Sequence, residues 1–486
     1  MKFLIFFKKL FSNKVFIYMG TRYLVYFLTF LSSMIIAARM GPYYLGIWGF
    51  ITLLLHYFKL INLGIGNSIT VLLVQNKEQN ERDDYEKSAM VIIGIISLIA
   101  VFIGFYYYFF GISVFGKYHL DKLFYFICII AVFQYFNDYF LKVSRVKGKM
   151  FEFTFYQTLL QVLVFIGIFF AKGKELINLL IGLYILAHII SLIIFISGGT
   201  ISFKGKVKRK KMSKIVSKGI HLFIYNLCFY LIILSTKTIV GLYYSIEEFG
   251  YFTFAYTLAN AAMLLLSAFS ALIMPKLIDK FDSLDKNIIE GTMNTIRINY
   301  MYLSHGIIYF AMIFFPLFII ILPQYSGTLK VINLSSLAVV LYSNSYGFIS
   351  FLMARNKEKV IARNSLICLI VNIIIALLLV KGFQVDYSYV ILATLITYLL
   401  YAYLTISSGR KELKTSIKFR IIIKEVFPQG ILIPFLVAII VTIINLKYIM
   451  FIPFLVYLLL NKKEIKEIFH SFILILNNPK VIDIKN

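Results

Sequence analysis

Residues 15–38 read VFIYMGTRYLVYFLTFLSSMIIAA, an almost unbroken apolar run. A helix rises about 1.5 Å per residue, so about 20 apolar residues cross the hydrocarbon core of a bilayer. The run therefore predicts a transmembrane helix. It is too long for the apolar core of a signal peptide and no small-x-small cleavage site ends it, which favours an uncleaved first span.

Similar apolar runs follow along the whole chain. The predicted spans are 15–38, 45–74, 88–110, 122–142, 153–171, 176–197, 220–243, 250–274, 298–322, 330–353, 361–380, 387–407, 429–446 and 448–461. The last two are short and join around Lys447, so they could form a hairpin, a re-entrant pair or one span. We therefore expect 12–14 transmembrane helices.

The composition agrees with a membrane protein. The chain has 486 residues, of which 60% are hydrophobic and 15% charged. Soluble domains carry about 45–50% apolar and about 25% charged residues. The three cysteines all fall inside predicted spans and rule out a disulfide scaffold. The fold class that remains is an all-α polytopic membrane protein.

The net charge of +27 is distributed unevenly along the chain. Most of the 49 lysines and arginines fall in the two tails and the even-numbered loops. Cytoplasmic loops are enriched in these residues, so both termini are expected in the cytoplasm. The basic run Lys204–Lys218 is interpreted as a cytoplasmic loop against anionic lipid headgroups rather than a nucleic-acid site.

An internal repeat predicts two related halves. The stretch GPYYLGIWGF (41–50) aligns with SIEEFGYFTF (245–254) at one fixed offset, after the first and seventh spans. These spans run in the same direction, so the repeat is parallel and predicts two six-helix bundles around a central cavity. Small or helix-breaking residues allow close packing and bending at Gly41, Pro42, Gly46, Gly64, Gly66 and Gly250.

These spans divide the chain into seven parts. We expect a cytoplasmic tail (1–14), an N-terminal bundle (15–198), a basic linker (199–219), a C-terminal bundle (220–408), a second linker (409–428), a transmembrane hairpin (429–461) and a cytoplasmic tail (462–486).

The loops offer no catalytic apparatus. They are too short to fold as domains, and the chain contains no P-loop, HExxH or metal-ligand spacing. The pair Asp83–Asp84, in NKEQNERDDYEK (76–87), has the look of a glycosyltransferase acidic pair, but a solvated cytoplasmic loop is favoured. We therefore expect a transporter rather than an enzyme, with no cofactor and no metal.

Ionisable residues inside the spans are the candidate functional groups, because a charge at the bilayer centre costs about 2.5–3.5 kcal/mol on insertion scales. Arg22 and Lys59 lie deep in their spans, which favours a water-filled cavity over snorkelling. Lys237 is long enough to snorkel outward, so both interpretations stay open. Asp138 is expected to pair with Lys142 four residues on, in preference to carrying a coupling proton.

The three intramembrane cations Arg22, Lys59 and Lys237 outnumber the single acid, Asp138. A cavity with excess positive charge suits an anionic substrate, and Arg and Lys are the usual partners of phosphate. A site for hydrophobic cations would instead hold a central acid.

Four stretches resemble bacterial polysaccharide flippases, which move the repeat units of O-antigen, lipopolysaccharide or capsule. They are ARMGPYYLGIWGF (38–50), LINLGIGNSI (60–69), TKTIVGLYYSIEEFGYFTFAYTL (236–258) and ALIMPKL (271–277). Relatives often carry an acid before the cation of the seventh span, where this chain has Thr236.

The resemblance implies membership of the multidrug/oligosaccharidyl-lipid/polysaccharide (MOP) exporter superfamily and alternating access between two bundles. It implies an undecaprenyl-pyrophosphate-linked oligosaccharide as substrate, moved to the outer leaflet of the bacterial cytoplasmic membrane. A coupling ion (H⁺ or Na⁺), a polysaccharide polymerase and glycosyltransferases are the further partners it suggests.

Three other functions remain open from the sequence. They are a cation-coupled multidrug antiporter, a peptidoglycan-precursor flippase of the same superfamily and, less favoured, a membrane polysaccharide polymerase or glycosyltransferase. A polymerase would be expected to need a sizeable outer loop, and the longest predicted outer loop is near Gly111–Asp121.

Overall fold

A computed structural model describes residues 14–76, 78–110, 116–120, 123–200, 204–283 and 286–468. Within these ranges, the side chains of 14–19, 221–222, 225–226, 265, 267–283, 286–288 and 292 are not described. The predicted N-terminal tail up to residue 13 and the C-terminal tail from residue 469 lie outside the described residues.

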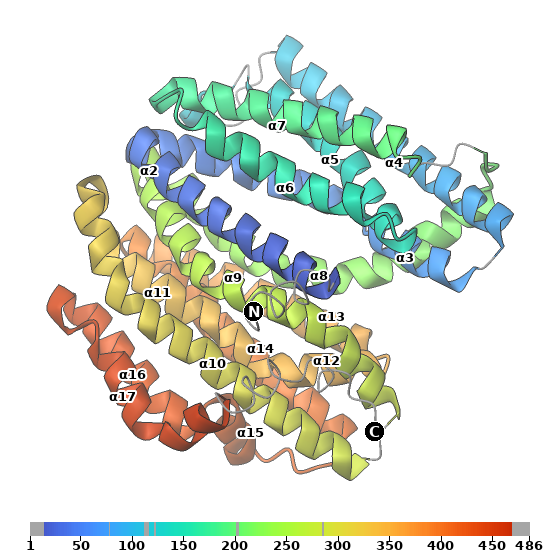
Figure 1. Ribbon diagram of the computed structural model, residues 1–486. Coiled ribbons are helices and arrows are strands. Elements are labelled where there is room, and N and C mark those ends of the chain that lie inside the picture. The colour runs from blue at the N-terminus through green and yellow to red at the C-terminus, as the bar shows by residue number, and fades with distance from the viewer. Residues whose placement is uncertain are drawn as a thin grey trace, which may run out of the picture. The chain divides into compact units, whose positions relative to one another are not determined.

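The chain forms two compact units, Met1–Leu227 (unit 1) and Cys228–Asn486 (unit 2). Unit 1 contains α2 (Lys14–Ile61), α3 (Ile65–Gln75), α4 (Gln79–Phe110), α5 (Leu123–Val146), α6 (Met150–Gly167), α7 (Gly173–Ser197) and the first part of α8 (Arg209–Tyr243). Figure 1 shows α4 to α7 as long helices lying side by side. The boundary between the units falls inside α8, so one helix belongs to both.

Unit 2 begins in α8 and continues with α9 (Ile246–Ser283), α10 (Lys286–Ile321), α11 (Leu329–Val340), α12 (Tyr346–Ala354), α13 (Glu358–Leu377), α14 (Ile391–Glu412), α15 (Phe419–Val426), α16 (Gln429–Ile444) and α17 (Ile452–Leu460). Short turns connect several of them, of which η3 (Leu341–Ser345) joins α11 to α12. α16 and α17 pack against each other. The described residues contain helices and turns but no strand, as predicted for an all-α protein.

The described residues contain nine helices long and apolar enough to cross a membrane, or up to ten if the bent pair α15 and α16 is one span. This is fewer than the predicted 12–14. Part of the difference lies in the stretch Gly20–Gln75, which counts once but has 56 residues. At about 1.5 Å per residue it exceeds two bilayer thicknesses, so it holds two of the predicted spans. Leu227–Tyr243 and Lys447–Leu460 are apolar but shorter helices.

Many large apolar side chains point outward rather than into the core. Phe102, Phe109 and Phe170 are 71%, 72% and 79% exposed, and Ile320 is 68% exposed. A soluble protein would bury such surface, whereas hydrocarbon chains cover it in a membrane.

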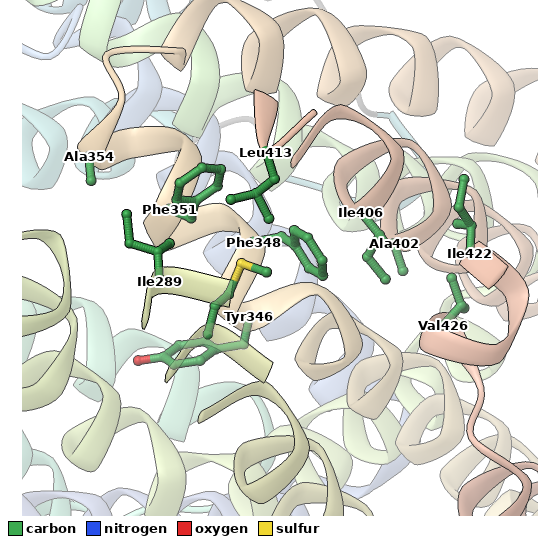
Figure 2. Packing of buried hydrophobic residues seen from close by; sticks show 11 residues of the cluster. Ile289, Tyr346, Phe348, Phe351, Ala354, Ala402, Ile406, Leu413, Ile422 and Val426 are labelled. Carbon is green, nitrogen blue, oxygen red and sulfur yellow. The ribbon is translucent and has the colours of Figure 1, made fainter. Parts of the chain in front are cut away.

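The core of unit 2 is built where α10, α12, α14 and α15 meet. Figure 2 shows this apolar cluster, in which Phe348 and Ile406 are fully buried. Phe348 fits against Gly409, where a Cβ atom would lie 2.2 Å from the ring. This packing fixes α14 and α15, which matter below, against the rest of unit 2.

Candidate substrate-binding site

The first break in α2 lies at Gly41, which separates the first predicted span from the second. Gly41 has φ 68° and ψ 172°, outside the helical region. Glycine adopts this conformation without a steric cost, and Pro42 then begins the next helical stretch with a suitable φ. Arg39, just before the break, donates to the carbonyls of Phe169 and Ala171 at 3.1 and 3.3 Å. Arg39 therefore binds the turn that follows α6.

The second break is sharper and lies between α2 and α3. Leu63 and Gly64 have φ of 48° and 68°, so both are left-handed. A Cβ on Gly64 would lie 2.9 Å from the carbonyl oxygen of Gly219, and one on Gly219 would lie 2.8 Å from that of Leu63. Two glycines thus allow the backbone of α8 to touch the break directly.

This break changes the position of Lys59. The sequence predicted it well inside a long second span, but α2 ends at Ile61, so Lys59 stands in the last helical turn. A cation there is favoured by the negative end of the helix dipole. Its side chain is 59% exposed, and His56, one turn earlier, is exposed too.

Lys59 forms an ion pair with Asp138 of α5, with 3.5 Å between Nζ and Oδ2. Tyr156 of α6 donates a hydrogen bond to the other carboxylate oxygen at 3.3 Å. Lys142, the predicted partner of Asp138, also interacts electrostatically with this carboxylate, but the ion pair is formed with Lys59. The end of α2 packs on α5, where the Tyr135 hydroxyl donates to the carbonyl of Phe58 at 2.8 Å, and helical spacing alone cannot reveal this contact.

Lys142 was not a predicted site residue, yet it belongs to the same cluster. Its electrostatic interactions are with Asp138, Arg145, Lys59 and Arg22. A Cβ on Gly66 would lie 3.2 Å from the Lys142 side chain, so α3 packs on this lysine. Lys142 thus interacts with one carboxylate and with three further cations of unit 1. The sequence signal for Lys142 and Arg145 was the run of basic residues at the end of the fourth span.

Arg22, in the first half of α2, donates a hydrogen bond to the hydroxyl of Tyr26 at 3.1 Å. It is partly buried, and its charge acts on Lys142. The structure thus connects Arg22 with the cluster around Asp138. We call Arg22, Lys59, Asp138, Lys142 and Arg145 the basic cluster.

A neutral polar pair lies beside the basic cluster. The amide of Asn137 donates to the backbone carbonyl of His188 at 2.9 Å and contacts the ring Nδ1 at 3.2 Å. His188 is 3% exposed, as expected of an interior histidine, and the charges of Asp138 and Lys59 act on it. This pair joins α5 to α7 and holds the helix that carries Asp138.

Lys237 lies in unit 2, so it is described separately. Its ammonium sits 4.2 Å from the ring centroid of Tyr256, a cation–π contact between α8 and α9. The neighbouring Thr236 hydroxyl contacts Thr394 at 2.8 Å and accepts from the amide of Asn372 at 2.9 Å. Uncharged groups of α13 and α14 therefore surround Thr236, the position before Lys237.

Gly46 and Gly250 lie in helices, where both are buried. The first falls in the second half of α2 and the second in the first turns of α9. They occupy equivalent places after the two repeat turns, where small residues permit close helix packing.

The acidic pair Asp83–Asp84 is not part of a solvated loop. Both residues lie in α4 and are 7% exposed. Asp84 accepts from the backbone N–H of Lys206 at 2.7 Å and pairs with Lys208 and Lys211 at 2.6 and 3.0 Å. Asp84 therefore holds the basic linker on the protein, whereas the Asp83 carboxylate accepts from Gln79 of the same helix at 2.9 Å.

Glycine makes this contact possible. A Cβ on Gly205 would lie 2.1 Å from the carbonyl oxygen of Asp83. Lys211 also pairs with Glu81 at 2.9 Å, and its ammonium lies 4.7 Å from the ring centroid of Tyr85. Several residues of the basic run, which was predicted to contact lipid headgroups, therefore contact α4 instead.

The described residues offer no cluster of His, Cys, Asp or Glu that could hold a metal ion. The three cysteines, Cys128, Cys228 and Cys368, are each buried and separate. What the geometry provides is a set of cations around one acid in unit 1 and one cation on an aromatic ring in unit 2.

The fold defines the class of protein. It matches an inward-facing multidrug resistance MATE family transporter of the MOP superfamily, with a TM-score of 0.68 and 12% identity over 80% of this chain and 94% of that one. It also matches the lipid II flippase MurJ in an inward closed conformation, with a TM-score of 0.65 and 16% identity over 94% and 100%. The chain therefore has the fold of MOP superfamily transporters.

The family follows from a second comparison. The family model described as polysaccharide biosynthesis protein matches residues 11–278. The chain belongs to this family, and the predicted membership of the polysaccharide flippases of the MOP superfamily is confirmed. The search of curated proteins gave no significant match.

Proposed function

We propose that the chain is a flippase for an undecaprenyl-pyrophosphate-linked oligosaccharide, and that the basic cluster binds the diphosphate. The observation that carries the proposal is the charge balance of this cluster, in which Lys59 pairs with Asp138 and Lys142 interacts with Asp138 and with the three cations Arg22, Lys59 and Arg145. A diphosphate supplies the missing negative charge, and Arg can bind it through two parallel hydrogen bonds.

The exposure of Lys59 supports this role. Its side chain is 59% exposed and its ion pair is 3.5 Å long, so the ammonium can turn towards a ligand without unfolding the helix. Arg22 is held by Tyr26 in a fixed orientation, which lowers the entropy lost on binding. We propose Lys237 as a further substrate contact in unit 2, on the face of Tyr256.

The family and the fold support the class of substrate. The family concerns polysaccharide biosynthesis, and one neighbour of the same fold is a lipid II flippase. Both point to a saccharide carried on a lipid. The proposed setting is the bacterial cytoplasmic membrane, with both termini in the cytoplasm, the parallel bundles 15–198 and 220–408 moving by alternating access, and a polymerase and glycosyltransferases acting before or after transport.

The test is export in cells that lack the gene. We expect lipid-linked repeat units to accumulate on the cytoplasmic leaflet and surface polymer to disappear, with both restored by the wild-type gene. Arg22→Ala and Lys59→Ala should insert normally but fail to restore export, whereas Lys330→Ala, a cation on Tyr389 outside the cluster, should restore it. Normal export by both cluster variants would refute the site.

Two results would assign another function. Unchanged surface polymer with increased drug sensitivity would indicate a multidrug transporter. Arrest of growth with accumulation of peptidoglycan precursor would indicate a lipid II flippase.

A further inference from the structure

A short basic segment of unit 2 lies between two membrane-spanning elements. α14 ends at Glu412, α15 spans Phe419–Val426, and the axis of α15 is bent by 65° from that of α16. α14 is part of a candidate span, and α16 is strongly apolar. Chain connectivity therefore puts residues 411–426 at the membrane–water boundary. We call these residues the boundary segment.

The apolar side chains of α15 lie on two adjoining strips. Ile422 and Val426, one turn apart, are 0% and 3% exposed and pack into the core of unit 2 (Figure 2). Phe419 and Ile423, also one turn apart, are 68% and 40% exposed. The first strip anchors the helix to the protein, and the second presents apolar surface away from it.

The basic side chains of α15 form a third strip beside the exposed apolar one. Arg420 and Lys424 follow Phe419 and Ile423 by one residue each, so both are turned by about 100° around the helix axis. Both are exposed, and Lys414 and Lys418 add two exposed lysines just before the helix. Apolar and basic strips side by side are typical of a helix lying in a membrane interface.

The acids of the boundary segment are already engaged elsewhere. Glu425 pairs with Arg410 at 2.6 Å, and its backbone carbonyl accepts from Arg297. Glu412 pairs with Lys357 at 3.3 Å. In the described part of the chain, no ion pair is found for Arg420 or Lys424, so their charge is available to a ligand.

The other basic segment, the linker before α8, differs in this respect. Lys208 and Lys211 pair with Asp84, and the backbone of Lys206 binds the same carboxylate. An anionic surface would have to compete with a buried acid for these groups. The boundary segment faces no such competitor.

We propose that the boundary segment is a binding surface for anionic phospholipids, with Phe419 and Ile423 among the acyl chains and Arg420 and Lys424 on the headgroups. Basic residues near an anionic membrane surface contribute roughly 1 kcal/mol each, which corresponds to about a fivefold preference per charge. This proposal does not rest on the substrate of the transporter.

The experiment uses the full chain in vesicles, with tryptophan as the reporter. Trp48 is the only tryptophan, so a protein with Trp48→Phe and Phe419→Trp reports from α15 alone. Brominated phosphatidylglycerol should quench this fluorescence more strongly than brominated phosphatidylcholine. Adding Arg420→Gln and Lys424→Gln should lower the preference for phosphatidylglycerol by about an order of magnitude.

The matched control is Arg209→Gln with Lys210→Gln, which removes the same charge from the linker, where both residues are also exposed. It should leave the lipid preference reported by the tryptophan in α15 unchanged. Equal quenching by both lipids, a preference unaffected by the Arg420 and Lys424 substitutions, or no quenching by either lipid would each overturn the proposal. Thermal unfolding of each variant checks that the fold is retained.

Discussion

In unit 1, Lys59 pairs with Asp138 and Lys142 interacts with both of them and with Arg22, whereas unit 2 joins Thr236, Asn372 and Thr394 through neutral hydrogen bonds. The amide of Asn372 also donates to the carbonyl of Ile232 at 2.9 Å. Neutral buried networks fix helices in one arrangement. An ion pair that is partly exposed and in charge excess can exchange its partner for a ligand. We therefore expect the main binding site in unit 1 and a mainly structural role for the neutral network of unit 2.

The largest effect on transport is expected in the basic cluster. The double variant Arg22→Ala, Lys59→Ala should lower transport of the lipid-linked oligosaccharide in proteoliposomes by about a hundredfold or more, because each charged hydrogen bond contributes about 1.5–3 kcal/mol. Its thermal stability should change little, since Lys59 is largely exposed. If stability and transport fall together, the basic cluster has a structural role, which contradicts the expected difference between the two units.

The second prediction concerns the neutral network. Asn372→Leu should lower the free energy of unfolding by about 1–3 kcal/mol, since hydroxyl and carbonyl partners on α8 lose their donor. Transport per correctly folded molecule should change much less than in the double variant. Thermal unfolding alongside a flipping assay measures both. A large loss of transport without loss of stability would show that this network also binds substrate or a coupling ion.

The third prediction concerns the break beside Lys59. Gly64→Ala should be destabilising by about 1–3 kcal/mol, because residue 64 has φ 68° and an added Cβ would lie 2.9 Å from Gly219. Gly182→Ala is the control, since no atom lies within 4 Å of its added Cβ. Equal unfolding temperatures for the two variants would contradict the close contact.

The smallest effect is expected at Lys237. Its cation–π contact contributes about 0.5–1 kcal/mol at a partly exposed site. Lys237→Gln should therefore reduce transport only severalfold, and Lys237→Arg should restore most of it, because Arg also stacks on Tyr256. Steady-state transport rates of the three proteins test this. A loss as large as that of the double variant would place the main binding site in unit 2 as well.

The helical fold could be predicted from the sequence because apolar runs report it residue by residue. The described residues give fewer spans than predicted, because Gly20–Gln75 counts once although it holds two predicted spans, and because Leu227–Tyr243 and Lys447–Leu460 are shorter helices. The ion pair between Asp138 and Lys59 could not be predicted either. Lys59 is 79 positions away in sequence, and only the packing of α2 on α5 brings the two side chains together.

The local charge pattern gave a wrong prediction for the acidic pair, because the linker folds back onto it. Asp83 and Asp84 lie in a stretch whose composition is typical of a loop. In the structure they belong to the first turns of α4, and the Asp84 carboxylate binds the linker. Gly205 is the sequence signal that could have been used, because its missing side chain permits the contact. A glycine between two lysines does not by itself predict which segment of the chain packs against it.

The contact between Gly64 and Gly219 also bears on how the protein is made. Residues 64 and 219 are far apart in the chain, so α3 emerges from the ribosome long before the segment that covers it. The left-handed residues of the break therefore lack their contact with Gly219 until the start of α8 has been synthesised and inserted. Helices α2 to α7 are therefore an incomplete folding unit, and a recombinant fragment of unit 1 should extend through Leu227 rather than stop at the linker.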